Sequence, residues 1–596
     1  MAKHSGNVFI GFDTETFRGS VKVLCASDGQ CIEPTHSDYT IELLQWLYEK
    51  TKDKVGFFFN IEYDMAAILK PWILSHKIEM RDGYTYKIGD FKVKQFPNKA
   101  FTIKYKNKKT AWFFDVANFF TINFTYRSLD DVAREFLGEK KNAKELGIDR
   151  KKIGEEKGYY EKHKDLIKKY CINDAALTEK LARLLSEMLE KLGFPVPNKW
   201  FSKASISKEF LKLVWSNKKE PALIRHIVKS SYRGGIFQTY YLGHFNRVYD
   251  VDINSAYPFA MSIMREYEKE VIHVKSENEL TQLTIRLTGL TVSQILDKVN
   301  LNNANMLKEI NQLLAAFYGF VHVKMKDMRY YGWKDKNKAI KYQRLKEEKE
   351  LWITFPDYLI QKLFGVQFEF IDAIILPTKR TYAFPFIHRL FQLKDKTKKE
   401  YGKESAQYYL IKVIINALYG ALAQHNPRET KFTNYVYASY ITALTRFTIR
   451  ALQKQIENVK GKVIAISTDG LVATKLPQIE KSDELGGFTV EEWNEYVHYM
   501  NGIYFYRITD KWKTKARGLG KIDPESLRKC DDFIYQVEMK KPTKIRTAVR
   551  QKEKNPAEFE ITIKHLDPIR YYLSLGYKIK ENWKIKDFWE KTQKVE

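Results

Sequence analysis

The first 190 or so residues alternate between short apolar runs and longer stretches of helical periodicity. Three apolar runs predict buried strands that lead into loops, at residues 7–17, 54–64 and 111–120. Residues 128–138 predict a short helix, because Ser128 with Asp131 fits a capping box and Gly138 fits a helix stop. Residues 161–193 predict a long amphipathic helix or a pair of helices. Alternating strands and helices are typical of an α/β domain.

The rest of the chain carries a second pattern of strands and helices. It predicts a turn, an apolar strand, two helices and a β-hairpin, in that order, at residues 231–235, 247–258, 384–402, 404–423 and 462–474. Asp469 and Gly470 stand at the predicted hairpin turn. Residues 262–350 are polar and mixed, and their pattern predicts no particular element. After about residue 505 the chain is rich in Lys, with short strand patterns and a helix-like end.

Length and charge narrow the class of protein. A chain of 596 residues is too long for a single core, so we expect about three to five domains or subdomains. The chain has 101 Lys and Arg against 73 Asp and Glu, a formal net charge of +28. A solvated Lys-rich surface is the plainer explanation, but an excess this large along the whole chain favours a nucleic-acid partner over a membrane surface.

The cysteines and the N-terminus indicate a compartment. Four cysteines show no CxxC and no zinc-site spacing, and we predict free thiols in a reducing compartment: Cys25, Cys31, Cys171 and Cys530. The N-terminus has no apolar signal region, and no stretch reaches 18 apolar residues. We therefore expect a soluble intracellular protein without a signal peptide or a transmembrane segment.

Two separate sets of acidic residues are the candidate chemistry. The first set lies at two predicted strand ends and on the long predicted helix: Asp13, Glu15, Asp64 and Asp174. The second set is Asp252, at the end of an apolar strand, and Asp469. Converging carboxylates hold divalent metals, and paired metals cleave or form phosphodiester bonds. Taken singly, each acid also fits a loop cap or a surface charge.

The sequences around the first set of acids resemble those of a known nuclease. The sequence "DTE" at 13–15, the spacing Asn60 to Asp64 and the spacing Tyr170 to Asp174 resemble the three motifs of the 3′–5′ proofreading exonuclease of B-family DNA polymerases. The resemblance implies that the four acids ligate metal and that Tyr170 helps to position water. It also implies that Asn60 and Tyr63 touch a single-stranded DNA end.

The contexts of the second set resemble the polymerase motifs of the same family. "DINSAYP", "KVIINALYG" and "STDG" resemble motifs A, B and C. The resemblance implies that Asp252 and Asp469 hold two Mg²⁺ ions for nucleotidyl transfer. It implies nucleotide-binding roles on the triphosphate, the sugar and the nascent pair for Lys394, Lys412, Tyr257, Asn416 and Tyr419. Without the motifs around them, the two tyrosines would be taken as ordinary core aromatics.

Some positions depart from the family pattern. Motif C usually reads Asp-Thr-Asp, and this chain has Ser467 in place of the first Asp, for which Asp250 is a candidate substitute. The family's Lys-x-Tyr motif has Tyr504 as its nearest match, without the lysine. Residues that the resemblance places on DNA are Tyr232, Gly234 and Gly235 of a Y-x-G-G motif, which equally fits a plain turn, together with Lys515 and Arg517.

The compact layout resembles the protein-primed branch of the family, found in viruses and linear plasmids. Members of that branch carry an insertion between motifs B and C. Here only 46 residues separate Gly420 from Ser467, and they read as core helix, so the sequence predicts that this insertion is absent or vestigial. The resemblance implies a multidomain α/β and α+β fold, with a ribonuclease-H-like exonuclease domain before a right-hand polymerase. The expected domains are exonuclease, linker with the start of the palm, palm with an inserted region, fingers, palm and thumb, at residues 1–192, 193–261, 262–376, 377–430, 431–505 and 506–596.

The sequence thus predicts a template-directed DNA polymerase with a proofreading exonuclease. Two Mg²⁺ ions are expected per active site, with Mn²⁺ able to substitute. The expected partners are primer-template DNA, dNTPs and a terminal protein or other replication factors, with no membrane, and the chain is expected to be a monomer in the host cytoplasm. The alternatives are a dedicated DNA exonuclease, or a single-strand-binding scaffold, with an inactive polymerase half.

Overall fold

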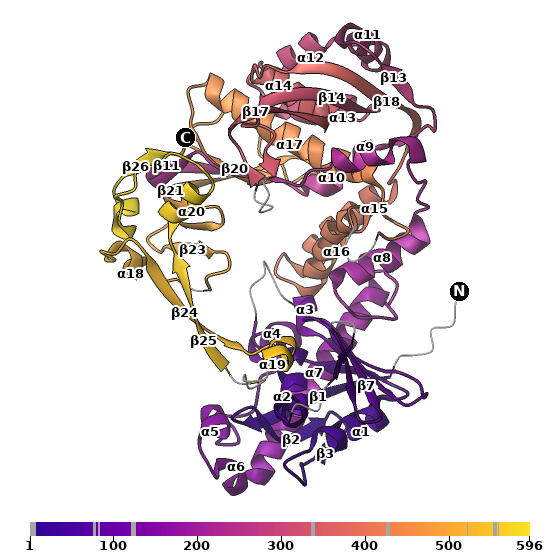
Figure 1. The fold of residues 1–596 in the computed structure, drawn as a ribbon, viewed down its shortest axis with the longest axis vertical. Helices are drawn as coiled ribbons and strands as arrows, with labels where there is room; N and C mark the ends of the chain where they lie inside the picture. The colour runs from indigo at the N-terminus through magenta and orange to yellow at the C-terminus, as the bar shows by residue number, and fades with distance from the viewer. Residues whose placement is uncertain are drawn as a thin grey trace. The chain divides into compact units, whose positions relative to one another are not determined.

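The structure is a computed structural model that describes residues 8–75, 79–81, 84–120, 127–334, 340–424, 429–520, 522–551, 557 and 559–596. The chain forms two compact units. The first consists of Met1–Leu213, Tyr401–Leu410 and Glu538–Ile563, and the second of Val214–Glu400, Ile411–Val537 and Lys564–Glu596. Figure 1 labels their helices and strands.

The first unit is built on one sheet, in the order β3-β2-β1-β4-β9-β8-β7-β6-β5. β1, β4 and β9 run parallel, and the other described pairs in this sheet are antiparallel. This arrangement around β1 is the ribonuclease-H-like one that the sequence predicts. The strands are β1 (Phe9–Phe17), β2 (Ser20–Ala26), β3 (Cys31–Ile32), β4 (Val55–Phe58), β5 (Glu79–Arg81), β6 (Thr85–Ile88), β7 (Phe91–Phe96), β8 (Ala100–Tyr105) and β9 (Ala111–Asp115).

Helices α1, α2, α5 and α7 pack against the sheet of the first unit, and α4 and α6 pack against α7. The helices between residues 40 and 214 are α1 (Thr40–Thr51), α2 (Ile61–Leu74), α3 (Ala117–Phe120), α4 (Leu129–Leu137), α5 (Arg150–Glu155), α6 (Tyr159–Lys162), α7 (Lys164–Lys191) and α8 (Lys203–Val214). The predicted helix after residue 128 is confirmed: Ser128 accepts a hydrogen bond from the Asp131 backbone N–H, and Gly138 ends α4 with φ 69°. The long predicted helix is also confirmed as α7, preceded by α6.

The prediction of four free thiols is wrong for two of the cysteines. Cys25 on β2 and Cys31 on β3 face each other across the strand pair and form a disulfide. Cys171 and Cys530 are free. Spacing alone did not reveal the pair, because only the tight β2–β3 hairpin brings the two Cβ atoms together.

The second unit contains two larger sheets. The first has the order β10-β19-β20-β11-β21-β22-β23, with β26 added on β11, and the second has the order β12-β18-β14-β17, with β13 added on β18. The strands of the first are β10 (Ile236–Thr239), β11 (Tyr241–Ile253), β19 (Val463–Thr468), β20 (Gly470–Ala473), β21 (Phe488–Met500), β22 (Ile503–Arg507), β23 (Lys513–Ala516) and β26 (Thr592–Lys594).

Residues 262–350, which the sequence pattern left unassigned, supply most of the second sheet. Its strands are β12 (Arg265–Tyr267), β13 (Ile272–Val274), β14 (Phe317–Asp327), β17 (Arg344–Thr354) and β18 (Glu369–Tyr382). The pattern was unreadable because the strands pair over long separations, such as Phe320 on β14 with Ile374 on β18. The remaining two-stranded sheets are β15 (Trp333–Lys334) with β16 (Ile340–Lys341), and β24 (Tyr535–Pro542) with β25 (Phe559–Leu566).

The helix α17 is the buried centre of the second unit, since most of its side chains are inaccessible to solvent. The α-helices from residue 225 onward are α9 (Arg225–Ser230), α10 (Ala256–Ile263), α11 (Glu277–Thr288), α12 (Val292–Val299), α13 (Leu307–Leu314), α14 (Phe355–Leu363), α15 (Phe386–Tyr401), α16 (Ala406–Leu422), α17 (Tyr435–Asn458), α18 (Pro524–Arg528), α19 (Ile545–Gln551) and α20 (Pro568–Ser574), of which α19 belongs to the first unit. The 3₁₀ turns are η1 (Ala222–Ile224), η2 (Ala304–Met306) and η3 (Ile585–Trp589). α15 and α16 confirm the two helices predicted at 384–423.

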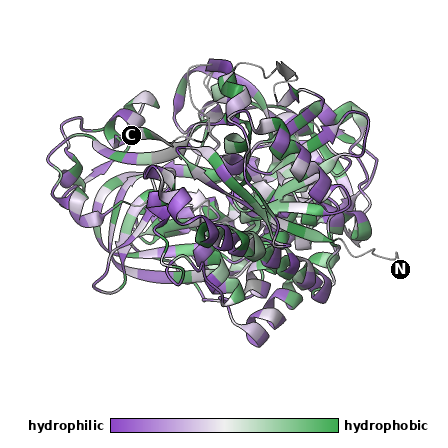
Figure 2. Ribbon diagram, turned by 90° about the horizontal axis from the view of Figure 1, so that it is seen from below, coloured by the Kyte–Doolittle hydropathy of each residue, from purple (hydrophilic) through white to green (hydrophobic). Residues whose placement is uncertain are grey.

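Figure 2 shows hydrophilic and hydrophobic residues interleaved along helices and strands, as elements with one buried face require. Among the described residues, no helix combines the length and the apolar character needed to cross a membrane.

Candidate active sites

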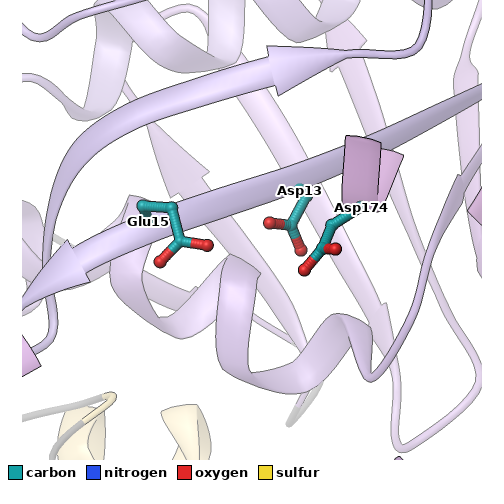
Figure 3. A group of neighbouring side chains, drawn as sticks. All are labelled: Asp13, Glu15 and Asp174. Atoms are coloured by element: carbon teal, nitrogen blue, oxygen red, sulfur yellow. The ribbon is translucent and has the colours of Figure 1, made fainter. Parts of the chain in front are cut away.

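Three carboxylates of the first unit converge on one point. Asp13 and Glu15 lie two residues apart on β1, and Asp174 comes from α7. One carboxylate oxygen from each residue lies within 4.8 Å of the other two. Figure 3 shows the three side chains gathered in the same space. The structure thus brings together three of the four acids predicted for this centre.

Glycine at position 11 explains how α7 comes so near to β1. A Cβ atom on Gly11 would lie 2.0 Å from the carbonyl oxygen of Ala175, so any side chain here would push the helix away. Gly11 and Asp13 face the same side of the strand because they are two residues apart. Since Asp174 precedes Ala175, the close approach places Asp174 beside Asp13.

The fourth acid, Asp64, lies in the first turn of α2 and is held by Thr14. Its Oδ1 accepts hydrogen bonds from the Thr14 backbone N–H at 3.2 Å and from the Thr14 hydroxyl at 2.7 Å. Asn60, just before α2, adopts a left-handed conformation with φ 71°, and its backbone N–H donates to Asp115 at 2.9 Å. The hydroxyl of Tyr63 lies 2.6 Å from the hydroxyl of Thr16 on β1.

Burial raises the pKa of the acids at this centre. For Asp13, desolvation is the largest cause, and the charges of Asp174, Glu15 and Asp64 add to it. Desolvation likewise raises the pKa of Glu15 to about 8 and that of Asp64 to about 7. Oδ1 of Asp174 is buried and has no hydrogen-bond partner in the described part of the chain. Crowded acids with a spare buried oxygen fit a divalent cation, which prefers carboxylate ligands.

Sequence reasoning missed a lysine at the first centre. The Nζ of Lys141 forms an ion pair with Asp174 and donates a hydrogen bond to the Tyr170 hydroxyl at 3.1 Å. Its charge lowers the pKa of both Asp13 and Asp174, in opposition to desolvation. Lys141 lies in an irregular segment between α4 and α5, where no periodicity distinguishes it from the many exposed lysines.

The second centre lies where two strands of the second unit meet. Asp252 on β11 pairs across the strands with Gly470 on β20, and the backbone N–H of Ile253 donates to the Asp469 carbonyl at 2.9 Å. The hairpin turn falls on Thr468 and Asp469, one residue earlier than predicted, and Thr468 has φ 60°.

Two glycines leave room for the hairpin turn at Thr468 and Asp469. A Cβ atom on Gly470 would lie 2.8 Å from Oδ1 of Asp252, and one on Gly235 would lie 2.6 Å from Cγ2 of Thr468. Gly235 precedes β10, whose Ile236 pairs with Thr468. The Y-x-G-G segment therefore packs directly on the strained turn that presents Asp469.

The acids of the second centre also raise one another's pKa. Desolvation, then the charges of Asp469 and Asp250, raises the pKa of Asp252 to about 8, while Lys412 opposes the rise. Desolvation and the charge of Glu491, which faces Asp250 on β21, raise the pKa of Asp250 to about 7. Asp250 thus adds negative charge beside the pair, in a chain where Ser467 replaces an acid. Asp252 and Asp469 together fit divalent metal as an all-oxygen donor set.

Three predicted tyrosines meet beside this centre. The rings of Tyr257 and Tyr419 have centroids 4.6 Å apart, and the Tyr419 hydroxyl forms a hydrogen bond with the Tyr232 hydroxyl. Tyr257 occupies the first turn of α10, two residues after Ser255, whose φ of 54° turns the chain from strand into helix. Desolvation and the charge of Asp469 raise the pKa of Tyr257.

Two predicted lysines lie close together at the second centre. Lys394 is almost fully buried, and its Nζ donates to the Ser255 hydroxyl at 3.1 Å. Desolvation, with a contribution from Lys412, lowers the pKa of Lys394 to about 8. Lys412 and Asn416 are exposed one turn apart on α16, on a face open to a ligand.

Two further predicted residues, Tyr504 and Lys515, lie on neighbouring strands, and a third, Arg517, directly follows β23. Tyr504 on β22 pairs directly with Lys515 on β23. Desolvation, together with the charges of Asp250 and Asp252, raises the pKa of Tyr504. The charge of Lys515 lowers the pKa of Asp250. The structure thus gives Tyr504 a lysine neighbour from another strand. Arg517 is exposed, and its guanidinium lies 5.6 Å from the centre of the Phe237 ring.

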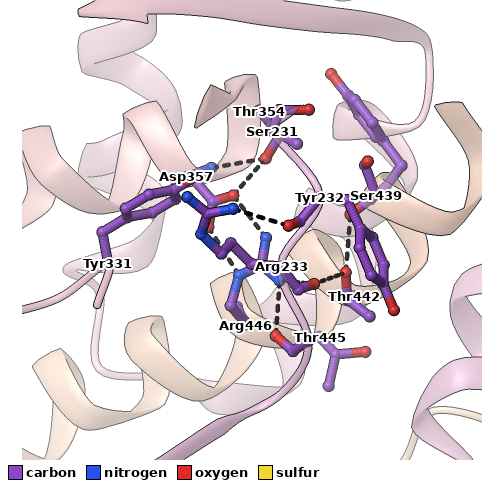
Figure 4. Close-up of polar contacts among 12 residues, drawn as sticks. Ser231, Tyr232, Arg233, Tyr331, Thr354, Asp357, Ser439, Thr442, Thr445 and Arg446 are labelled. Carbon is purple, nitrogen blue, oxygen red and sulfur yellow. Dashed lines mark hydrogen bonds and ion pairs between the residues drawn. The ribbon is translucent and has the colours of Figure 1, made fainter. Parts of the chain in front are cut away.

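A buried ion pair beneath the Y-x-G-G segment was not predicted. Arg446 on α17 binds Asp357 on α14 through two hydrogen bonds, of 2.9 and 2.6 Å. Its remaining nitrogen donates to the carbonyl oxygens of Arg233 and Gly234 at 2.7 and 2.9 Å. Figure 4 shows Arg446 beside Asp357 and Arg233. Because C=O and N–H point opposite ways in a trans peptide, turning these carbonyls toward Arg446 directs the following N–H groups away from it.

Comparisons with known proteins agree with this layout. A family model described as DNA polymerase type B, organellar and viral, matches residues 39–439. The DNA polymerase of Acidianus bottle-shaped virus (isolate Italy/Pozzuoli) is 24% identical over 554 residues, which cover 84% of this chain and 79% of the viral protein. Phi29 DNA polymerase complexed with primer-template DNA matches with a TM-score of 0.60 at 15% identity, over 94% of this chain and 99% of that one. Its ternary complex with incoming nucleotide matches with a TM-score of 0.59.

Proposed function

Since the chain belongs to the type B DNA polymerases of the organellar and viral kind, we propose that it extends a primer 3′ end with dNTPs and trims that end with a 3′–5′ exonuclease. The placement of Asp252 against the Asp469 turn carries the first half of the proposal. The convergence of Asp13, Glu15 and Asp174 carries the second. Two separate carboxylate sites fit two opposed reactions on one strand.

In synthesis, Asp252 and Asp469 hold the metals, and the neighbouring side chains bind the nucleotide. Lys412 and Lys394 neutralise the triphosphate. Lys412 is near enough to both Lys394 and Asp252 for its charge to lower their pKa. Tyr257 packs under the sugar and excludes a 2′ hydroxyl, held there by its ring contact with Tyr419. Asn416 faces the same open side of α16 as Lys412 and contacts the nascent pair.

In proofreading, Asp13, Glu15, Asp64 and Asp174 hold the metals. The Tyr170 hydroxyl orients the attacking water, and Lys141 holds that hydroxyl through its hydrogen bond. Asn60 and Tyr63, at the start of α2, contact the unpaired 3′ end.

We assign two Mg²⁺ ions to each site, with Mn²⁺ as a functional substitute. When bound, such ions activate the attacking oxygen and stabilise the leaving one. Primer-template DNA is the macromolecular substrate. Tyr232, Gly234 and Gly235 contact its backbone, and Lys515 and Arg517 bind the primer strand near Tyr504. We propose a monomer that works in the host cytoplasm, with the domain limits stated above, and leave a priming terminal protein as a partner to be tested.

Extension of a primed template with Mg²⁺, with and without dNTPs, tests both activities. We expect extension with dNTPs and shortening of the primer without them. Asp469→Ala should abolish extension and retain shortening, and Asp13→Ala should do the reverse. Glu480→Ala, which removes an exposed acid of the same unit, is the matched control. A protein that never extends primers would be a dedicated nuclease, and one with neither activity would be a binding scaffold.

A further inference from the structure

The second unit contains a pocket that lies away from Asp252 and Asp469. It has a volume of about 520 Å³ and opens where the end of β10, the start of β11, the start of β19 and the C-terminus meet. β26 at the C-terminus pairs with β11, as Figure 1 shows. Val463 lines the pocket at the start of β19, five residues before the Thr468 turn. At the rise of a strand, that separation is on the order of 17 Å.

Aromatic rings dominate the walls. Five tyrosines contribute to the lining: Tyr240, Tyr241, Tyr330, Tyr342 and Tyr577. They come from four separate parts of the chain, so no single helix or strand pattern explains their gathering. Several of them are only partly buried, so ring surface remains available to a ligand. Ring faces of this kind stack on nucleobases without regard to sequence.

Positive charge without a partner lies at the same pocket. Arg344 and Lys462 both line it and are exposed. In the part of the chain that the structure describes, neither has a carboxylate within ion-pair distance, although Asp327 faces Arg344 across the strand pair and its pKa is lowered in part by the Arg344 charge. The ammonium of Lys462 lies 5.5 Å from the centre of the Tyr241 ring. Two other cations of the lining are already committed, since Arg329 pairs with Asp327 and Lys594 with Glu596.

Another cation, Arg450, lies behind the residues that line the pocket and is fully buried. Its guanidinium donates hydrogen bonds to the side chains of Gln238, Tyr240 and Gln453, all of which line the pocket. It also lies 5.4 Å from the centre of the Tyr330 ring and 5.8 Å from that of Tyr342.

The environment of Arg450 compensates its charge only in part. Its hydrogen-bond partners are neutral, and no carboxylate among the described residues lies within ion-pair distance, but the charge of Glu457, which also lines the pocket, interacts with that of Arg450. Its Nε has no hydrogen-bond partner in the described part of the chain. A buried guanidinium held only by neutral groups is costly unless an anion compensates it.

We propose that this pocket binds a nucleotide, with its base against the tyrosines and its phosphate near Arg344 and Lys462. The volume is in the range of small-molecule sites and suits one nucleotide unit. Stacking faces favour an unpaired base, because a base inside a duplex has both faces covered. The ligand is a free nucleotide or one unit of a single strand, and the two share the same recognition chemistry. The proposal does not depend on the roles assigned to the two carboxylate centres.

Photo-cross-linking of the full chain tests the proposal. Two probes are used: 5-iodo-2′-deoxyuridine 5′-monophosphate, and a short single-stranded oligothymidylate carrying one iododeoxyuridine. Irradiation joins this base to aromatic side chains in contact with it, and mass spectrometry of the peptides locates the links. We expect links at Tyr330, Tyr342 or Tyr577. Links made by both probes identify a free-nucleotide site, and links made by the oligonucleotide alone identify a strand site.

Paired substitutions then test the cations. Arg344→Ala with Lys462→Ala should reduce the yield of these links about tenfold or more, because charged hydrogen bonds to the phosphate are lost. Lys346→Ala removes an exposed lysine of the same strand that does not line the pocket, and it should leave the yield unchanged. Links confined to tyrosines elsewhere, or equal yields in the paired variant and the control, would overturn the proposal. The positions of the cross-links on the unaltered protein are determined without any substitution, so this part of the test does not depend on the folding of a variant.

Discussion

Asp252 and Gly470 face each other on adjacent antiparallel strands, and Oδ1 of Asp252 lies 2.8 Å from the point where a side chain on residue 470 would begin. The missing side chain is what leaves room for the carboxylate. The catalytic geometry that we propose for synthesis therefore depends on a residue with no functional group.

Gly470→Ala should displace the Asp252 carboxylate and impair synthesis alone. A displacement of about 1 Å at a reacting centre costs on the order of a hundredfold in rate. Primer extension should fall by about this factor, and shortening of single-stranded DNA should be unchanged. Gly154→Ala, at a position where a Cβ meets nothing closer than 4.0 Å, is the control. Normal extension by Gly470→Ala would show that Asp252 needs no such space.

Lys141→Gln should change the pH dependence of DNA shortening. The Lys141 charge lowers the pKa of Asp13, Glu15 and Asp174, so its removal raises them further. More hydroxide is then needed to ionise the acids, and the rising limb of the pH–rate profile should move to higher pH. Lys144→Gln, an exposed lysine three residues later, should leave the profile in place. A drop in rate with an unmoved profile would indicate a purely structural role.

Tyr257→Ala should relax the choice between dNTPs and rNTPs. The ring of Tyr257 packs against Tyr419, so it stands as a fixed wall where we place the sugar. Without that wall, we expect the kcat/KM ratio of dNTP to rNTP to fall by about tenfold or more. Tyr257→Phe keeps the ring and should keep the ratio. Equal loss in both variants would assign the selectivity to the hydroxyl.

The Arg446–Asp357 pair should matter for both stability and DNA binding. Removing one partner leaves a buried charge, so Arg446→Met should lower the free energy of unfolding by about 3–5 kcal/mol. Asp357→Leu in the same chain should restore part of the loss, which denaturant titration can measure. If the pair also orients residues 232–235, the double variant should bind primer-template DNA more weakly even where its stability is restored.

His498 should make the protein less stable in mild acid. The side chain is buried, and desolvation lowers its pKa to about 3. Between the ordinary pKa of 6.5 and that value, the unfolded chain takes up a proton that the folded chain does not. Stability from this residue is complete above pH 6.5 and falls by about 1.4 kcal/mol per pH unit below it.

His498→Gln isolates this contribution, because glutamine does not titrate. Gln can still hydrogen-bond to the Thr239 and Tyr496 hydroxyls that contact the imidazole. Plots of unfolding free energy against pH for the two proteins should diverge by this slope as the pH falls below 6.5. Parallel plots would mean that the imidazole is protonated in the folded state.

Sequence signals that act over a few residues, such as helix caps, correctly predicted the elements that form through local interactions. The helix α4 begins after Ser128 and ends at Gly138 because a cap acts within a few residues. The motif residues also fell on the expected elements, as Asp174 on α7 and Lys412 on α16 show. The hairpin turn lies one residue earlier than predicted, since Thr468 adopts a positive φ and Gly470 already pairs with Ser467 as the first residue of β20.

By itself the sequence determined which side chains are candidates for chemistry, because motif spacing and periodicity are properties of neighbouring residues. Only the tertiary structure decided which groups surround them. Lys141 meets Asp174 across 33 residues, and Arg446 meets Asp357 across 89. The strands of residues 262–350 and the Cys25–Cys31 bond likewise depend on partners brought together by folding. Such contacts follow from packing and burial in three dimensions, which no periodicity along the chain records.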